Sequence, residues 1–263
     1  APAVANGIVV CGADDGLLRA LDAKTGKPKW QFKTAGQIRA SPAIVVGPKA
    51  AGNVEGRVVF GSWDGRCYCV RLSDGKEFWR FRTRPTVRVK VAPAVASGRV
   101  YVGAWDRFDI WALDLGTGKP LAGYQQPGQR GSGRFGLVHG MAVYRGLMAT
   151  IGAGLIIDTL VDTVTGKRLG SATSSSRMRM VAGAPAFRGG QVFTYNNTLG
   201  VKLSDVASGR KVAAAKRRGT GFNHSVLNTP VITRKLIVAA TDAGTLEVRR
   251  LPDGKGDEPA ELV

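Results

Sequence analysis

Short apolar runs alternate with polar turn residues along the whole chain. The first unit contains an apolar strand at residues 8–12, a polar turn at 14–16, a strand through Leu21 and a further strand that begins at Trp30. Between the last two strands, Thr25, Gly26 and Lys27 form a turn in which glycine can adopt a positive φ. A small-Pro-Ala-Val segment at residues 1–4 and an Asn-Gly dipeptide precede this set. The pattern therefore predicts four short antiparallel strands joined by tight turns.

This four-strand pattern returns along the chain. The turn glycines are separated by 49, 43, 48, 43 and 45 residues, and they are Gly26, Gly75, Gly118, Gly166, Gly209 and Gly254. Segments related to residues 1–4 lie ahead of the later glycines, at 41–44, 92–95, 140–143, 183–186 and 228–231. A period of this length with four short strands per repeat is typical of the blades of a β-propeller.

The most complete copy runs from Ala20 to Trp30 and reads Ala-Leu-Asp-Ala-Lys-Thr-Gly-Lys-Pro-Lys-Trp. It resembles the blade signature Ala-x-Asp-x-x-Thr-Gly-x-x-x-Trp of the pyrroloquinoline quinone (PQQ)-like propeller repeat family. The second copy, aligned from Val70 to Trp79, is one residue shorter, and Ala122 stands at the Trp position of the third. The resemblance covers nearly the whole chain, and a WD40-type four-strand repeat is the alternative.

The resemblance implies an all-β fold, a β-propeller of four-stranded antiparallel blades in a single domain at residues 1–263. Six repeats are visible, at about 1–40, 41–91, 92–139, 140–182, 183–227 and 228–263. Because the family usually has seven or eight blades, we expect this chain to be part of a larger ring, with a closed six-bladed ring as the alternative. Trp30 and Trp79 are expected to be buried between blades, each with its indole N–H on a carbonyl of the neighbouring repeat.

Charge adds a candidate binding face to this picture. Lys and Arg total 38 and Asp and Glu total 19, so the net charge is +19, which attracts anionic partners. Arginine collects in the connections from the outer strand of one repeat to the inner strand of the next, and two Trp-Asp turns are expected on the same side. The predicted partner-binding residues are Arg39, Trp63, Arg84, Arg88, Lys90, Trp105, Arg130, Arg134, Arg177, Arg179, Arg217 and Arg218. The alternative is ordinary solvated charge along strand edges.

Catalytic or cofactor chemistry has little support in the sequence. PQQ dehydrogenases carry an adjacent Cys-Cys pair and a calcium site, whereas Cys11, Cys67 and Cys69 are not adjacent and suit small gaps in a core. His139 and His224 lack ligand-like spacing from the cysteines, and no apolar run is long enough to cross a membrane. We therefore predict no catalytic residue, cofactor, metal or small-molecule substrate.

Three functions remain open at this point. The favoured one is a non-catalytic scaffold or interaction domain that docks on an acidic protein or multiprotein complex through the Arg-rich face. The alternatives are a binder of nucleic acid or another anionic polymer, and a fragment of a PQQ-dependent dehydrogenase. The resemblance extends to the lipoprotein of outer-membrane β-barrel assembly, which implies a periplasmic or other extracytoplasmic bacterial location.

Overall fold

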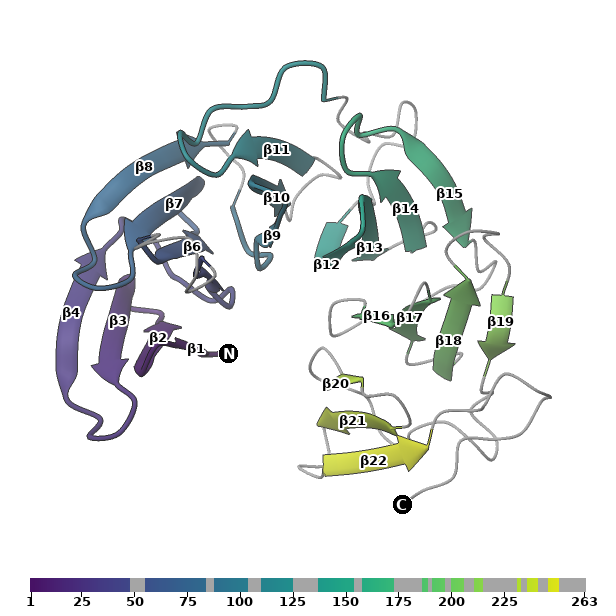
Figure 1. Ribbon diagram of the computed structural model, residues 1–263, viewed down its shortest axis with the longest axis horizontal. Coiled ribbons are helices and arrows are strands. Elements are labelled where there is room, and N and C mark those ends of the chain that lie inside the picture. Colours follow the sequence, from purple (N-terminus) through teal and green to yellow (C-terminus); the bar gives the residue numbers. More distant parts are fainter. Residues whose placement is uncertain are drawn as a thin grey trace. The chain divides into compact units, whose positions relative to one another are not determined.

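The computed structural model describes residues 1–47, 55–83, 88–103, 110–124, 137–153, 158–172, 186–188, 191–196, 200–205, 211–214, 231–232, 236–240 and 246–250. In these residues the regular secondary structure is entirely β, and the strands form six antiparallel sheets of three or four strands (Figure 1). The chain divides into two compact units, Ala1–Gly128 and Gln129–Val263.

The first unit contains three of the described sheets. Its strands are β1 (Ala3–Ala5), β2 (Ile8–Gly12), β3 (Leu17–Asp22) and β4 (Pro28–Lys33); β5 (Ala43–Val45), β6 (Arg57–Gly61), β7 (Arg66–Arg71) and β8 (Glu77–Arg82); and β9 (Ala94–Ala96), β10 (Arg99–Gly103) and β11 (Ile110–Asp114). Consecutive strands pair within each sheet (Figure 1). The first strands of neighbouring sheets lie side by side, β1 with β5 and β5 with β9.

The second unit contains the other three described sheets. Its strands are β12 (Leu137–Tyr144), β13 (Leu147–Ala153), β14 (Asp158–Asp162) and β15 (Arg168–Ala172); β16 (Ala186–Arg188), β17 (Gln191–Asn196), β18 (Gly200–Asp205) and β19 (Lys211–Ala214); and β20 (Val231–Ile232), β21 (Leu236–Ala240) and β22 (Leu246–Arg250). The six described sheets follow the order of the sequence repeats, except that β12 begins at Leu137, ahead of the expected start at 140.

The tight hairpins between the first two strands of a sheet have the backbone that their sequences demand. Asn6 and Gly7 have φ of 49° and 72°, and Ser97 and Gly98 have 50° and 72°. Positive φ at both central positions gives a turn whose twist matches that of the flanking strands. Arg145 and Gly146, with 45° and 80°, form a third such turn that the sequence analysis did not single out.

The Asp-x-x-Thr-Gly turn between the last two strands of a sheet is closed by its aspartate. Oδ1 of Asp22 accepts hydrogen bonds from the backbone N–H of Lys24 (3.1 Å) and from the N–H and hydroxyl of Thr25 (both 2.9 Å). The N–H of Gly26, whose φ is 69°, then bonds to the carbonyl of Asp22 at 2.9 Å. The same bonds from Thr recur at Asp114 and Asp162, so the signature encodes a side-chain-capped turn.

The strand register corrects the alignment of the second copy. Ala20 lies opposite Trp30, and Cys69 lies opposite Trp79, each just before a β-bulge. Cys69, rather than Val70, therefore occupies the position of Ala20, and the two copies have equal length. The alignment from Val70 was wrong because it matched apolar character, whereas the pairing across the bulge sets the register.

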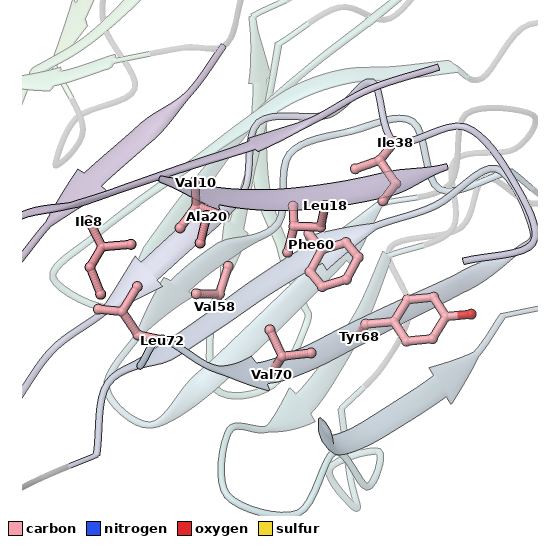
Figure 2. Packing of buried hydrophobic residues seen from close by; sticks show 10 residues of the cluster. All are labelled: Ile8, Val10, Leu18, Ala20, Ile38, Val58, Phe60, Tyr68, Val70 and Leu72. Atoms are coloured by element: carbon pink, nitrogen blue, oxygen red, sulfur yellow. The ribbon is translucent and has the colours of Figure 1, made fainter. Parts of the chain in front are cut away.

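The hydrophobic core of the first unit lies between its sheets. Figure 2 shows one cluster, in which Val10 and Leu18 from the first sheet face Val58 and Phe60 from the second, all of them fully buried. Cys67 and Cys69 are buried free thiols in a second cluster, and Cys11 is half-buried. Desolvation raises the pKa of Cys67, and raises that of Cys69 to about 11, so both remain neutral packing groups.

Candidate functional site

Backbone hydrogen bonds hold the connection from β4 to β5 against the turns of two neighbouring sheets. The N–H of Ile38 bonds to the carbonyl of Ala13 (3.0 Å) in the β2–β3 turn of its own sheet. The N–H of Trp63, in the β6–β7 turn of the next sheet, bonds to the carbonyl of Gln37 (2.9 Å). The connector and both turns therefore lie at the same end of the two sheets.

The following connector repeats this arrangement. The N–H of Val89 bonds to the carbonyl of Ser62 at 3.2 Å, as that of Ile38 bonds to Ala13. Val89 is thus the counterpart of Ile38, and Lys90 is the counterpart of Arg39. Equivalent positions in two connectors therefore carry a cationic side chain.

Three cationic side chains converge on Trp63. The ring centroid lies 4.6 Å from Cζ of Arg39, 5.3 Å from Cζ of Arg88 and 4.4 Å from Nζ of Lys90. All three distances are within the range of a cation–π interaction. We call Arg39, Trp63, Arg88 and Lys90 the Trp63 cluster. It joins four of the residues singled out in the sequence.

Arg39 links two adjacent turns. Its Nε and Nη2 donate to the two carboxylate oxygens of Asp14, at 2.6 and 2.7 Å, while its guanidinium also contacts Trp63. Both partners of the ion pair are about half exposed, and the hydrogen bonds from Arg39 hold the pKa of Asp14 below its ordinary value. Asp14 and Trp63 are equivalent positions, because each directly precedes the aspartate of its turn, Asp15 or Asp64. Arg39 therefore contacts the same position in two consecutive turns.

Asp64 orients the turn that carries Trp63. Its side chain is 4% exposed, forms an ion pair with Arg66, and accepts hydrogen bonds from the hydroxyl of Tyr68 (2.6 Å) and the N–H of Arg66 (3.0 Å). Burial, followed by this bond to Asp64, raises the pKa of Tyr68 to about 12. The carboxylate of Asp64 is therefore a structural group.

Close packing of the backbone brings the connector to this turn. A Cβ at Gly36 would lie 2.4 Å from the backbone nitrogen of Asp64, closer than any side chain allows. Glycine is required at this position because two backbones meet there.

A second group of arginines lies at the other end of β6 and β7. Arg57 and Arg71, which are paired across the two strands, lie over the ring of Phe78 with Cζ at 4.0 and 5.6 Å from its centroid. Arg71 also forms ion pairs with Glu55 (2.6 Å) and Asp74 (3.4 Å). Sequence reasoning did not select this group, although arginines at both ends of a hairpin next to a phenylalanine were visible. Glu55 and Asp74 offset part of its charge, as Asp14 does for Arg39 in the Trp63 cluster.

The two outer-strand tryptophans contact the next sheet. Trp30 donates its indole N–H to the carbonyl of Leu72 (2.8 Å), and Trp79 donates to that of Leu115 (2.9 Å). The rings lie directly against Gly75 and Gly118, where a Cβ would come within 2.6 and 2.5 Å of ring atoms. Trp79 is 7% exposed, whereas Trp30 is only partly buried, so the expectation that both are buried requires correction. Both tryptophans lie on the last strand of a four-stranded sheet, so their position in the sheet does not account for this difference.

The remaining predicted binding residues fall outside the described part of the chain. They are Arg84, Trp105, Arg130, Arg134, Arg177, Arg179, Arg217 and Arg218. Among the residues that the structure describes, no group of three or more His, Cys, Asp or Glu side chains could hold a metal ion. The same part of the chain contains no helix with the length and apolar character to span a membrane.

Two of the solved structures with a similar fold have low sequence identity to this chain. The computationally designed Ika8 protein is 18% identical, with a TM-score of 0.75 over 100% of this chain and 72% of the designed chain. BamB from Moraxella catarrhalis is 14% identical, with a TM-score of 0.69 over 98% of this chain and 70% of that one. Both likenesses concern the fold alone.

A search of curated proteins found no matching sequence. The family model for the outer membrane protein assembly factor BamB matches residues 1–51 and 39–256. This match extends over most of the chain, and the repeats it describes are the PQQ-like repeats that carry the turn signature. The chain therefore belongs to the family of the outer membrane protein assembly factor BamB.

Proposed function

We propose that this protein is a non-catalytic β-propeller scaffold that docks on an acidic protein or multiprotein complex through the Trp63 cluster and the neighbouring connector arginines. The observation that carries the proposal is the convergence of Arg39, Arg88 and Lys90 on Trp63 from two connectors. Family membership supports a role in interaction.

The repetition of the sheets supports the proposal of a propeller. Sheets of three or four strands recur in chain order, and the outer-strand Trp of one sheet contacts the Asp-x-x-Thr-Gly turn, or its counterpart, of the next. A radial array of such sheets leaves only short edges and exposes rigidly supported loops, which suits a binding surface.

The location rests on the relative. BamB is named as an outer membrane protein assembly factor. By analogy, this protein acts outside the bacterial cytoplasm as one component of a protein assembly. Fractionation of the host cells tests this point: recovery of the native protein in the cytoplasmic fraction would contradict it.

The charge of the protein supports an acidic partner. The net charge of +19 draws anionic molecules towards the protein. Each exposed contact at the cluster contributes only about 0.2–1 kcal/mol. Several contacts must therefore act together, and their sum falls steeply with salt because exposed charges are screened.

Charge reversal on two sets of residues tests the binding face. Arg39, Arg88 and Lys90 are replaced together by Glu, and the matched control replaces the exposed turn residues Lys27, Lys119 and Lys167 by Glu, with the same change in net charge. Poly-L-glutamate serves as the acidic probe, and binding to the full chain is followed by fluorescence anisotropy at low and high salt. We expect the cluster variant to bind much more weakly at low salt and the control to lose much less. Equal losses would show that net charge, rather than this face, attracts the probe.

A further inference from the structure

The second and third sheets each carry a socket for the outer-strand tryptophan of the sheet before. A socket consists of a turn glycine, against which the indole ring lies, and a carbonyl that accepts a hydrogen bond from the indole N–H. Both turn glycines are buried. The two sockets are Gly75 with Leu72, occupied by Trp30, and Gly118 with Leu115, occupied by Trp79.

The first sheet carries the same socket in an open form. Ala23 is the counterpart of Leu72, because the N–H of each donates to the connection between the first two strands of its sheet, both at 2.8 Å. Gly26 is the counterpart of Gly75, with φ of 69° and 75°. Ala23 and Gly26 are exposed, and a Cβ at Gly26 would meet nothing within 4 Å. In the part of the chain that the structure describes, no ring fills this socket.

The open socket borders an apolar sheet face. The strand registers match five residues of the first sheet with five of the second: Val4 with Ile44, Val9 with Val58, Cys11 with Phe60, Arg19 with Tyr68 and Leu21 with Val70. Four of the second-sheet residues are buried in the cluster of Figure 2, where the first sheet covers them. Their first-sheet counterparts are only half-buried, and Val4 is 63% exposed. We call Val4, Val9, Cys11, Arg19, Leu21, Ala23 and Gly26 the first-sheet face.

The occupied sockets show which kind of strand fits such a face. In each, the tryptophan is followed two residues later by a phenylalanine, in Trp30-Gln31-Phe32 and in Trp79-Arg80-Phe81. Side chains two residues apart on a strand share one face, so both rings reach the neighbouring sheet. The Phe32 ring centroid lies 5.8 Å from that of Phe60, and the Phe81 centroid lies 6.1 Å from that of Trp111. The fitting occupant is therefore an extended strand with the pattern Trp-x-Phe.

Cys11 and Arg19 are placed to receive such a phenylalanine on the first sheet. They lie opposite each other on β2 and β3, as Phe60 and Tyr68 do on β6 and β7. Asp15 accepts hydrogen bonds from both Nη atoms of Arg19 and fixes its guanidinium. This pairing uses the edge of the planar group, and an aromatic ring packs on the face of a guanidinium.

No further tryptophan of this chain matches the pattern. Among the five tryptophans in the sequence, only Trp30 and Trp79 are followed two residues later by Phe, and both already occupy sockets. A second copy of the chain carries the same two strands, occupied in the same way. The Trp-x-Phe strand that fits the first-sheet face therefore comes from outside these 263 residues.

We propose that the first-sheet face binds an extended strand of a partner protein that carries Trp and Phe two residues apart. The Trp ring lies against Gly26 and donates its N–H to the carbonyl of Ala23, and the Phe ring packs on Cys11 and Arg19. This interaction goes beyond the proposed function, because it is mainly apolar and uses no residue of the Trp63 cluster. It should therefore persist at high salt.

Two isomeric hairpins test the pattern directly. Both are head-to-tail cyclised β-hairpins of identical composition with one Trp and one Phe among Thr residues of one strand, at alternate positions in the first and adjacent positions in the second. Calorimetric titration into the full chain at high salt measures both affinities. We expect the alternate hairpin to bind roughly tenfold more tightly, since only it presents both rings to the face. Benzothienylalanine in place of its Trp removes the N–H and should weaken binding roughly fivefold.

Alanine substitutions at two glycines locate the binding site. Gly26 and Gly98 have φ of 69° and 72°, and a Cβ at either would meet nothing within 4 Å, so G26A and G98A carry the same local strain. Only Gly26 belongs to a socket, where a Cβ takes the place of the incoming ring. We expect G26A to bind the alternate hairpin no better than the adjacent one, and G98A to bind it as the wild type does.

Alkylation of Cys11 gives a second readout on the same face. Cys67 and Cys69 are buried, whereas Cys11 is half-buried, so iodoacetamide should modify Cys11 first. The alternate hairpin should slow this modification in proportion to the fraction of protein bound, as measured by mass spectrometry. The adjacent hairpin at the same concentration should leave the rate nearly unchanged.

Each contrary result overturns the proposal in a different way. Equal affinity for the two hairpins rules out recognition of the Trp-x-Phe pattern, and unchanged binding by G26A places the site elsewhere. A Cys11 thiol that is as unreactive as Cys67 in the isolated full chain shows that the face is already covered. Sedimentation then distinguishes a second copy, which gives a dimer, from coverage within one chain, which gives a monomer.

Discussion

At the scale of single residues, tryptophan serves two different purposes in this protein. Trp30 and Trp79 use the indole N–H to bond a carbonyl of the next sheet, with their rings against a turn glycine. Trp63 has its N–H edge turned inward and uses the ring to contact cations. The first use supports packing between sheets, and the second organises charge at the surface.

Substitutions at the outer-strand tryptophans should separate packing from hydrogen bonding. Trp79→Ala should lower the free energy of unfolding by about 3–5 kcal/mol because it empties a buried site. Trp79→Phe keeps most of the apolar contact and removes the bond to Leu115, at a cost nearer 1–3 kcal/mol. Trp30→Ala should cost less than Trp79→Ala, since Trp30 is partly exposed. Urea denaturation measures all three. A loss under about 1 kcal/mol for Trp79→Ala would contradict the docking role.

At the scale of elements, the turn between the last two strands combines a local requirement with a contact to another sheet. Gly26 and Gly75 occupy equivalent turns with φ of 69° and 75°. A Cβ at Gly26 would meet nothing within 4 Å, whereas one at Gly75 would lie 2.6 Å from Trp30. The same backbone conformation therefore has different consequences in the two copies.

Replacing Gly26 or Gly75 by alanine gives two variants that can be compared directly. Gly26→Ala should cost about 1–2 kcal/mol from the left-handed backbone alone. Gly75→Ala adds displacement of the Trp30 ring, for a further penalty of about 1–3 kcal/mol. Thermal or urea unfolding compares the two variants, and Gly75→Ala combined with Trp30→Ala should recover part of the additional loss. Equal costs for the two single variants would show that the ring does not press on Gly75 in solution.

At the scale of the whole molecule, the protein combines an excess of positive charge with carboxylates whose pKa values are lowered. Hydrogen bonds from Arg19, and then from the N–H of Leu17, lower the pKa of Asp15 from 3.8 to about 2. The pKa values of Asp14, Asp22 and Asp114 are also below 3.8, through bonds from Arg39, Thr25 and Thr117 respectively. Protonation of these groups would remove native contacts and increase the net positive charge.

The protein should therefore be acid-sensitive within a defined window. A carboxylate with a lowered folded pKa contributes stability that is fully present above about pH 5 and is lost as the pH falls towards 2. Urea midpoints should be flat from neutral pH to about pH 5 and then decline. Asp15→Asn should lower the midpoint at neutral pH and make the decline shallower. An identical pH profile for the variant would show that Asp15 does not contribute.

Much of the architecture was predictable from local sequence. Alternating apolar residues and turn glycines predicted strands such as Ile8–Gly12, which the structure contains with the same bounds. The hairpins at Asn6-Gly7 and Ser97-Gly98 were equally visible because positive φ is a local preference of these residues. The grouping of cations at the connectors selected Arg39, Arg88 and Lys90, and the Trp-Asp turn selected Trp63, as residues expected on one face.

The details of the site depended on packing between sheets. Three features left no clear signal in the sequence. Arg71 occupies the Asp position of the second turn, Nε1 of Trp63 is oriented inward, and Arg57 contacts Phe78 and Cys69.

The sequence by itself determined the repeats, the strand and turn pattern and the excess of basic connectors, because periodicity, φ preference and charge are properties of neighbouring residues. Only the tertiary structure decided the register across each bulge and which cations meet on Trp63. Those depend on how closely one sheet approaches the next, as at Gly36 and Asp64, and on contacts between residues far apart in the chain.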